Sequence, residues 1–572
     1  MEIGFVAVLG LLAIVAVSAF APKVGVAAPL ILTVVGIAFG LLPGVPDVEV
    51  PPEWILAGVL PPLLYSSAIT LPVVDFRRDF GTISALSVVL VVVSAVLTGL
   101  VLAALLPGVG LASAIALGAV ISPTDVVAAT SIGKRLGLPS RLTTILEGEG
   151  LVNDATALVL LRSAVAVGAL STDVEMDALD VVGDFGYAVA VAVAIGFVVG
   201  FATVWVRRRL ADPVLDTAIS FAVPFLAYLP AEHLDASGVL AVVVAGLYTG
   251  HNGARHFSAQ ARIAQRLNWR TVQFVLENAV FLVMGVQITS IVSEVVESRA
   301  SVVLAVVIGL VLSLVLAVVR FLFVAPLLLA VRRSMRRAER GHRRFERVLE
   351  YWRSLRMLDP RQERRRERAE TAFERRGNDL AQLRTEGLGW RGGLVLGWSG
   401  MRGVVTLAAA QSLPVDTPDR AQLVLIAFTV AITTLLVQGS TLPWVIRRSG
   451  VRGSDETADN RELATLLDEI NEAGLTTLDD EDPDDEVVQR VRHDTLLGAQ
   501  SAWERARVDD GDVEAPHSRY RALRRDVLAA EREALLDARS RRAYPSRILR
   551  RAQALLDLEE TRLAQADGSA DH

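Results

Sequence analysis

The sequence predicts an all-α polytopic membrane protein. Apolar residues make up 52% of its 572 residues and the mean hydropathy is +0.45, both above the norm for soluble domains. A bilayer-spanning helix needs ~20 mostly apolar residues. On that criterion we predict thirteen transmembrane helices, near residues 3–21, 25–43, 53–70, 82–106, 110–130, 142–168, 184–206, 213–230, 236–250, 271–292, 301–331, 391–412 and 420–446. The first run has no basic n-region or cleavage site, so we interpret it as a retained helix rather than a signal peptide.

The loops between these segments alternate in charge. Every second loop is basic, from Lys23 in the first loop to the Arg-dense stretch 332–391, and the others are acidic or neutral apart from Arg299 and Arg420. The positive-inside rule assigns the basic loops to the cytoplasm. We therefore predict a cell-membrane protein with its N-terminus outside, its C-terminus in the cytoplasm and an odd number of helices.

The helix count predicts an internal symmetry. If the seventh helix is a connector, helices one to six and eight to thirteen form two inverted six-helix repeats, a framework of many secondary transporters. The fifth helix of each repeat contains helix breakers, which are Pro123 in one and Gly400 and Gly403, flanking Arg402, in the other. Proline removes a backbone donor, and the freed groups need polar partners. We expect helices five and twelve to be broken and to cross.

Two acids stand inside the apolar segments. Asp154 lies in the middle of segment 142–168, and Asp125 follows the predicted break at Pro123. An ionisable group at such depth costs ~3 kcal/mol on insertion scales, so each acid is a candidate functional residue. Asp125 could instead cap the helix that follows the break. Two buried carboxylates on adjacent helices predict a cation or proton pathway.

Composition and motifs exclude several other functions. The chain has no Cys, which excludes disulfides, thiol catalysis and Cys-based metal sites. Its seven His residues show no metal-ligand spacing, and the C-terminal region has no phosphate-binding glycine loop. We expect no cofactor, no enzymatic activity and no nucleic-acid partner. A cation channel and a membrane sensor remain as alternatives to a transporter.

The residues that carry these features resemble one known family. They are Ser122 to Asp125, Glu149 to Ala155, Arg320 and Gly400 to Gly403, and together they resemble the cation:proton antiporter 1 family, the NhaP/NHE-type sodium/proton exchangers. The resemblance covers the whole membrane region. It implies exchange of Na+ for H+ across the lipid bilayer by alternating access, for Na+ and pH homeostasis, in a homodimer. Related families with an Asp-Asp pair in place of Asn153-Asp154 are generally electrogenic, so Asn153 implies electroneutral exchange.

The family also implies roles for single residues. Asp154 resembles the essential carboxylate that binds the cation or the proton, and Asp125 and the Thr124 main chain resemble neighbouring Na+ ligands. Oxygen atoms suit a hard cation such as Na+, and competition at one carboxylate would couple the two flows. Asn153 is assigned either to the ligand shell or to structure. Gly150 replaces the usual Ser of the family, so K+ or Li+ stays open as the exchanged cation.

Three further charged residues resemble ones that have a structural role in the family. Glu149 and Arg320 resemble an ion pair between the sixth and eleventh helices, and Arg402 resembles an arginine of the second broken helix. An unpaired Arg320 would be costly in this apolar segment. Glu277 is the alternative partner for it.

The soluble parts frame the predicted membrane region. We expect the 332–390 insertion to be a helical hairpin broken at Asp359-Pro360, which could bind anionic headgroups or the acidic tail. We expect the tail to contain an acidic disordered linker at 479–486 and amphipathic helices broken at Pro545, with an unknown partner. The predicted division of the chain is 1–331 with helices one to eleven, 332–390, 391–446 with helices twelve and thirteen, and 447–572.

Overall fold

The computed structural model is helical throughout the residues that it describes, and no strand occurs among them. The chain divides into two compact units, Met1–Gly453 and Ser454–His572. The described residues are 2–24, 26–42, 50–169, 178–210, 212–354, 360–385, 388–451, 453, 456–479, 481–493, 495–496, 516–541, 548–549, 552–553 and 555–560.

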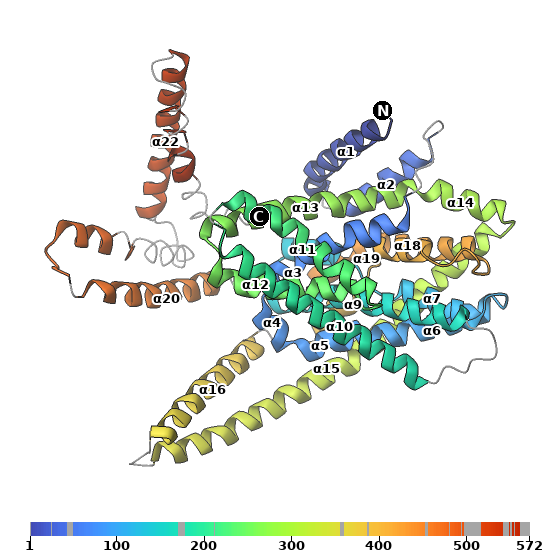
Figure 1. Ribbon diagram of the computed structural model, residues 1–572, viewed down its shortest axis with the longest axis horizontal. Coiled ribbons are helices and arrows are strands. Elements are labelled where there is room, and N and C mark those ends of the chain that lie inside the picture. Colours follow the sequence, from blue (N-terminus) through green and yellow to red (C-terminus); the bar gives the residue numbers. More distant parts are fainter. Residues whose placement is uncertain are drawn as a thin grey trace. The chain divides into compact units, whose positions relative to one another are not determined.

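The first unit contains most of the helices (Figure 1). Its first half comprises α1 (Glu2–Val24), α2 (Ala28–Gly40), a π-helical turn η1 (Trp54–Val59), α3 (Leu60–Thr70), α4 (Val73–Arg78), α5 (Phe80–Ser84), a second π-helical turn η2 (Ala85–Leu90), α6 (Val91–Leu105), α7 (Leu111–Ile121), α8 (Val126–Arg135) and α9 (Ser140–Ala169). Its second half comprises α10 (Ala178–Arg207), α11 (Pro213–His233), α12 (Gly238–His256), α13 (Ala259–Val286), α14 (Ile288–Glu297), α15 (Val302–Ser354), α16 (Pro360–Thr385), α17 (Trp390–Trp398), α18 (Val404–Gln411) and α19 (Arg420–Ser449).

Each predicted membrane segment coincides with one of these helical elements or with two or three consecutive ones. Seven continuous helical stretches among the described residues are long and apolar enough to cross a membrane, and four shorter apolar helices accompany them. The all-helical fold class is therefore confirmed for this part of the chain. The total of thirteen spans and the inverted repeats remain predictions.

Polar residues in the loops start several of the helices. Asp212 accepts a hydrogen bond from the Val214 amide at 2.8 Å and so caps α11, and Ser258 accepts one from the Ala261 amide at 3.1 Å at the start of α13. Such caps satisfy amides that have no partner within the helix. The cap at Ser258 also explains why α13 begins at Ala259, well before the apolar segment predicted from residue 271.

The chain breaks its helical course between α7 and α8. Helix α7 ends at Ile121, and α8 begins at Val126 after four residues that include Pro123. Proline has no amide to donate and its ring disfavours a helical residue before it, so the helix cannot continue. The predicted break of this segment is therefore present.

A second break separates α17 from α18. Residues 399–403 are not helical, and Gly400 and Gly403 lie within them. Side chains approach both glycines closely: a Cβ atom at Gly400 would lie 2.7 Å from Cδ of Arg320, and one at Gly403 would lie 2.7 Å from Cγ of Asp125. The absence of a side chain at these positions allows this packing.

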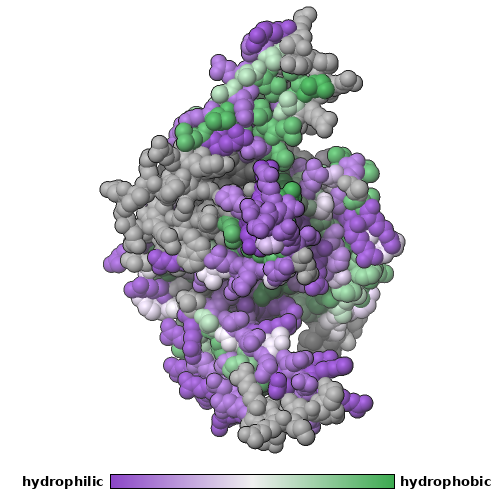
Figure 2. Space-filling view, turned by 90° about the vertical axis from the view of Figure 1, so that its left-hand side faces the viewer, coloured by the Kyte–Doolittle hydropathy of each residue, from purple (hydrophilic) through white to green (hydrophobic). Residues whose placement is uncertain are grey.

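Helix α15 extends far beyond its apolar part. Its 53 residues span about 80 Å at 1.5 Å per residue, against a hydrocarbon core of ~30 Å. The distal part pairs with α16 as a hairpin, in which His342 stacks on Phe373 and Arg384 contacts Glu339 at 2.9 Å (Figure 1). Its surface is mainly hydrophilic (Figure 2, lower end). The predicted helical insertion is thus a hairpin, but its break at Asp359 lies outside the described residues.

The second unit is also helical where it is described, with α20 (Glu456–Leu475), a 3₁₀ turn η3 (Thr476–Leu478) and α22 (Pro516–Ser540). In the described part of the acidic run Asp482 and Asp485 accept hydrogen bonds from the amides two residues later, which is typical of turns. The disordered linker at 479–486 stays a prediction. Residues 555–560 are helical, and Arg532 of α22 contacts Asp557 at 3.0 Å. Pro545 lies outside the described residues.

Candidate functional site

The two helix breaks meet in the first unit. The Asp125 amide donates a hydrogen bond of 2.7 Å to the Met401 carbonyl, which joins the two non-helical segments directly. The Asp125 side chain then caps α8, since its Oδ1 accepts from the Val127 amide at 2.9 Å. The other carboxylate oxygen faces Gly403. The predicted crossing of the broken helices is therefore present at Asp125.

Arg402 supplies donors to the carbonyl groups at both breaks. Its Nε donates to the Ile121 carbonyl at 3.0 Å, and a terminal nitrogen reaches the Ser122 carbonyl at 3.4 Å. The other terminal nitrogen donates to the carbonyl of Gly400. The side chain is 2% exposed, so these contacts replace the hydrogen bonds that the broken helices lack. Arg402 thus holds the crossing together by its fixed guanidinium geometry.

A sealed ion pair lies behind the crossing. Arg320 donates two hydrogen bonds to the Glu149 carboxylate, at 2.5 and 2.9 Å, and a third to the Leu396 carbonyl at 3.0 Å. Both side chains are 2% exposed. Thr124 also donates to Glu149, at 2.8 Å. Glu149, not the alternative Glu277, is therefore the partner of Arg320.

Asn153 completes this sealed face of α9. It lies one turn after Glu149, and its Nδ2 donates to the Thr124 carbonyl at 3.0 Å and to the Thr124 hydroxyl at 3.1 Å. The Asn153 amide thus fixes the peptide that precedes Asp125. Its Oδ1 is buried and has no hydrogen-bond partner within the described part of the chain.

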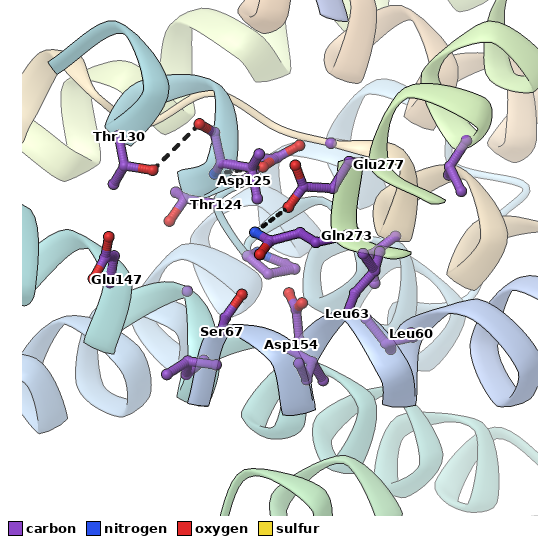
Figure 3. Close-up of a pocket in the computed structure, with 18 of the residues that line it drawn as sticks. Leu60, Leu63, Ser67, Thr124, Asp125, Thr130, Glu147, Asp154, Gln273 and Glu277 are labelled. Atoms are coloured by element: carbon purple, nitrogen blue, oxygen red, sulfur yellow. Dashed lines mark hydrogen bonds between the residues drawn. The ribbon is translucent and has the colours of Figure 1, made fainter. Parts of the chain in front are cut away.

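A cavity of about 210 Å³ opens on the other side of the crossing. Asp154 from α9 and Asp125 from the first break line it, with Pro123, Thr124 and Gly403 beside them. Figure 3 shows the Asp154 carboxylate pointing into this space. Within the described residues neither Asp125 nor Asp154 forms an ion pair with a basic side chain. The two predicted acids therefore share one cavity and keep carboxylate oxygens free for a proton or a cation.

One end of the cavity reaches the surface at the end of α8. Lys134 lines it there with an exposed fraction of 64%, and its ammonium contacts Glu147 at 2.8 Å. Thr70, the last residue of α3, also lines the cavity. Both helices lead into loops that the sequence assigns to the cytoplasm.

Gly150 also lines the cavity, one turn before Asp154. A serine at this position would place a hydroxyl at the cavity wall, and the glycine leaves that place to a water molecule or a carbonyl. The polar residues that line the cavity without having been assigned to it from the sequence include Ser67, Thr130, Glu147, Gln273, Glu277 and Thr406. A sequence signal existed for one pair only, because Gln273 and Glu277 have the i, i+4 spacing of residues on one helix face.

Comparisons with known proteins agree with this arrangement. The family model described as sodium/hydrogen exchanger, transmembrane, matches residues 9–448. An uncharacterised Na+/H+ exchanger of Mycobacterium tuberculosis H37Rv is 29% identical, over 98% of this chain and 96% of the relative. A sodium, potassium, lithium and rubidium/H+ antiporter of Bacillus pumilus is 28% identical, over 77% of this chain and 61% of the relative.

The fold is similar to a solved structure. The sodium proton antiporter MjNhaP1 from Methanocaldococcus jannaschii, solved at pH 8, superposes with a TM-score of 0.56. The match covers 79% of this chain and 100% of that one, at 15% sequence identity. At this identity the likeness concerns the fold alone.

Proposed function

Because the chain belongs to the transmembrane sodium/hydrogen exchanger family, which consists of secondary transporters, we propose that it is an electroneutral Na+/H+ antiporter. It is a multi-pass membrane protein of that family. The observation that carries the proposal is the cavity shared by Asp154 and Asp125 at the crossing of the two broken helices. Carboxylates without a basic partner at such a depth require a proton or a metal cation as counter-charge.

Asp154 binds either ion in this proposal. Sodium takes oxygen ligands, and Asp154, Asp125 and the Thr124 main chain, which line the same cavity, are the ligands that we propose. A proton on Asp154 removes its charge and thereby its affinity for the cation. Since one carboxylate cannot hold both, binding of the two ions is mutually exclusive. Such competition couples the flows without ATP.

Access to the site alternates between the two sides of the membrane. The cavity reaches the surface near Lys134 and Thr70, at loops predicted to be cytoplasmic, which fits an inward-facing state. The outward-facing state requires that the broken helices move against the rest of the bundle. We also propose the homodimer, the outside N-terminus and the inverted repeats that the family resemblance implies.

Electroneutrality rests on Asn153. The Asn153 side chain is neutral, and its Nδ2 donates to the Thr124 carbonyl and hydroxyl. Asp154 is then the single α9 acid at this level that exchanges a proton for a cation. Transport by the wild type is expected to be insensitive to an imposed membrane potential.

The exchanged cation has a second candidate. Gly150 removes a ligand hydroxyl from the cavity wall, and the related Bacillus antiporter is named for K+, Li+ and Rb+ as well as Na+. A site with one fixed ligand fewer selects less strictly by size. Potassium or lithium exchange is therefore the alternative to a strict Na+ preference.

Everted vesicles with an internal pH dye test the proposal. Addition of Na+ to wild type should move protons, and Asp154→Asn at equal expression should abolish this movement. Separate additions of K+ and Li+ give the selectivity. Absence of a response to every cation, or an equal response of the Asp154→Asn variant, would overturn the proposal and favour a channel or a sensor.

A further inference from the structure

A third acid faces the cavity from the helix opposite Asp154. Glu277 lies in the middle of α13 and lines the cavity together with Asp125 and Asp154. Figure 3 shows its carboxylate on the wall across from that of Asp154. The three carboxylates come from α13, α9 and the first helix break, so the tertiary fold brings them together around one space.

Glu277 is held by a neutral residue. Gln273, one turn earlier on α13, donates a hydrogen bond from Nε2 to Glu277 Oε1 at 2.6 Å. This bond fixes the direction of the carboxylate and leaves its charge uncompensated. Its second oxygen, Oε2, accepts no hydrogen bond from any of the described residues and is available to a ligand.

Basic residues near Glu277 are engaged elsewhere. Lys134 lines the same cavity, but its ammonium contacts Glu147 at 2.8 Å. Arg270 precedes Gln273 on α13, yet it is exposed and does not line the cavity. No ion pair of Glu277 occurs within the described part of the chain. Glu149 shows the contrast, since its buried carboxylate is neutralised by Arg320.

The charge balance of the cavity then points to a ligand. Once Lys134 is assigned to Glu147, the carboxylates of Asp125, Asp154 and Glu277 remain without a basic partner. Unpaired buried acids are costly, so each must carry a proton or accompany a cation. One Na+ at Asp154 and Asp125 compensates only one of the three negative charges. Glu277 must therefore itself carry a proton or lie beside a cation in the cavity.

We infer that Glu277 is a further ion-binding residue of the antiporter, which takes up the cation from the cytoplasmic end of the cavity before it reaches Asp154 and Asp125. The inference rests on the proposed function. A cavity lined by one sign of charge raises the local concentration of the counter-ion, and Glu277 extends that field from the crossing toward α13. Its contribution is to the capture of the cation, and the exchange of cation for proton stays at Asp154.

Kinetics in everted vesicles test this inference, because the cytoplasmic face of the membrane is then outside and the added cation enters through this cavity. Glu277→Gln keeps the shape of the side chain and removes its charge. We expect the KM for Na+ to rise about tenfold, the lower end of the gain that such focusing provides, with the maximal rate largely retained. Glu277→Asp, which keeps the carboxylate, should recover most of the affinity.

Two further variants secure the interpretation. Glu297→Gln neutralises an exposed glutamate of α14 outside the cavity and should leave the KM unchanged. Glu277→Ala provides a second neutral variant if Glu277→Gln does not reach the membrane. A KM equal to that of wild type in either folded neutral variant would overturn the inference, while wild-type exchange would still support the proposed function. If the wild type itself showed no cation-evoked proton movement, both the proposed function and this inference would be overturned.

Discussion

The two faces of α9 carry acids in opposite settings. Glu149 faces the sealed side, where Arg320 and Thr124 occupy its oxygens at 2.5 to 2.9 Å. Asp154, five residues later, faces the cavity and has no basic partner among the described side chains. Both acids are deep in an apolar segment, so depth alone does not distinguish a structural acid from a transport acid.

The difference lies in the counter-charge. The Arg320 guanidinium pairs with Glu149 inside the protein, and that pair ties α9 to α15 and, through the Leu396 carbonyl, to α17. In the proposed function Asp154 obtains its counter-charge from solution, as a proton or a cation. On this proposal the sealed face supplies a rigid support and the open face supplies the exchangeable site. The following substitutions test this division.

The largest effect on stability is expected on the sealed face. Glu149→Gln leaves the Arg320 guanidinium buried without a counter-charge, which costs ~3–5 kcal/mol. Thermal denaturation of the purified Glu149→Gln protein should show a much lower melting temperature than that of wild type. The double variant Glu149→Gln/Arg320→Met removes both charges and should be less destabilised than the single one. Equal stability of Glu149→Gln and wild type would contradict the structural role that we give to the Glu149–Arg320 pair.

A steric change at the crossing comes next. Gly403→Ala places a Cβ atom against the Asp125 carboxylate, 2.7 Å from its Cγ, and the overlap costs ~1–3 kcal/mol. We expect lower thermal stability together with a weaker Na+ response in vesicles, because Asp125 must shift. Gly474→Ala in α20, where no atom lies within 4 Å of the added Cβ, is the matched control. An unaffected Gly403→Ala variant would show that the two breaks are not tightly packed.

Asp125 belongs to both settings, because it caps α8 and lines the cavity. Asn is as good an N-cap as Asp, so Asp125→Asn should keep the stability of wild type and lose cation-evoked transport. Asp125→Ala should lose transport and also ~1 kcal/mol of stability. Denaturation and vesicle assays on both variants separate the two roles. Transport by Asp125→Asn at the wild-type rate would reduce Asp125 to a cap.

The smallest effect is expected at the surface end of the cavity. Lys134 and Glu147 form an ion pair with exposed fractions of 64% and 26%, so water and salt screen it. Lys134→Gln should change the free energy of unfolding by ~0–1 kcal/mol. Thermal denaturation at low and high salt checks this value. A decrease in stability as large as that of Glu149→Gln would mean that the exposed ion pair stabilises the fold as much as the buried one.

Local chemistry made part of this arrangement predictable. Pro123, Gly400 and Gly403 indicate the helix breaks because their effects on the backbone are local, and Asp125 and Asp154 stand out against apolar neighbours. The apolar runs likewise predicted where helices lie. Polar helical turns were not predicted by this criterion. The first turns of α13, which begin at Ala259, are one example.

Contacts between distant segments were not predictable in the same way. The bond from the Asp125 amide to the Met401 carbonyl joins residues far apart in the chain, and backbone groups leave no sequence signal for such pairing. Glu277 shows the same limit. Its sequence context left Arg320 as a possible partner, and only the tertiary packing shows that Glu277 lines the cavity while Arg320 pairs with Glu149.

The most direct test of the account is proton release on cation binding. Purified protein in weakly buffered detergent solution should release about one proton per bound Na+, because both ions compete for Asp154. Asp154→Asn should release none, whereas a variant of the sealed face that remains folded, such as Glu149→Gln/Arg320→Met, should still release protons. Equal proton release from wild type and Asp154→Asn would contradict the assignment of the exchangeable site to the open face of α9.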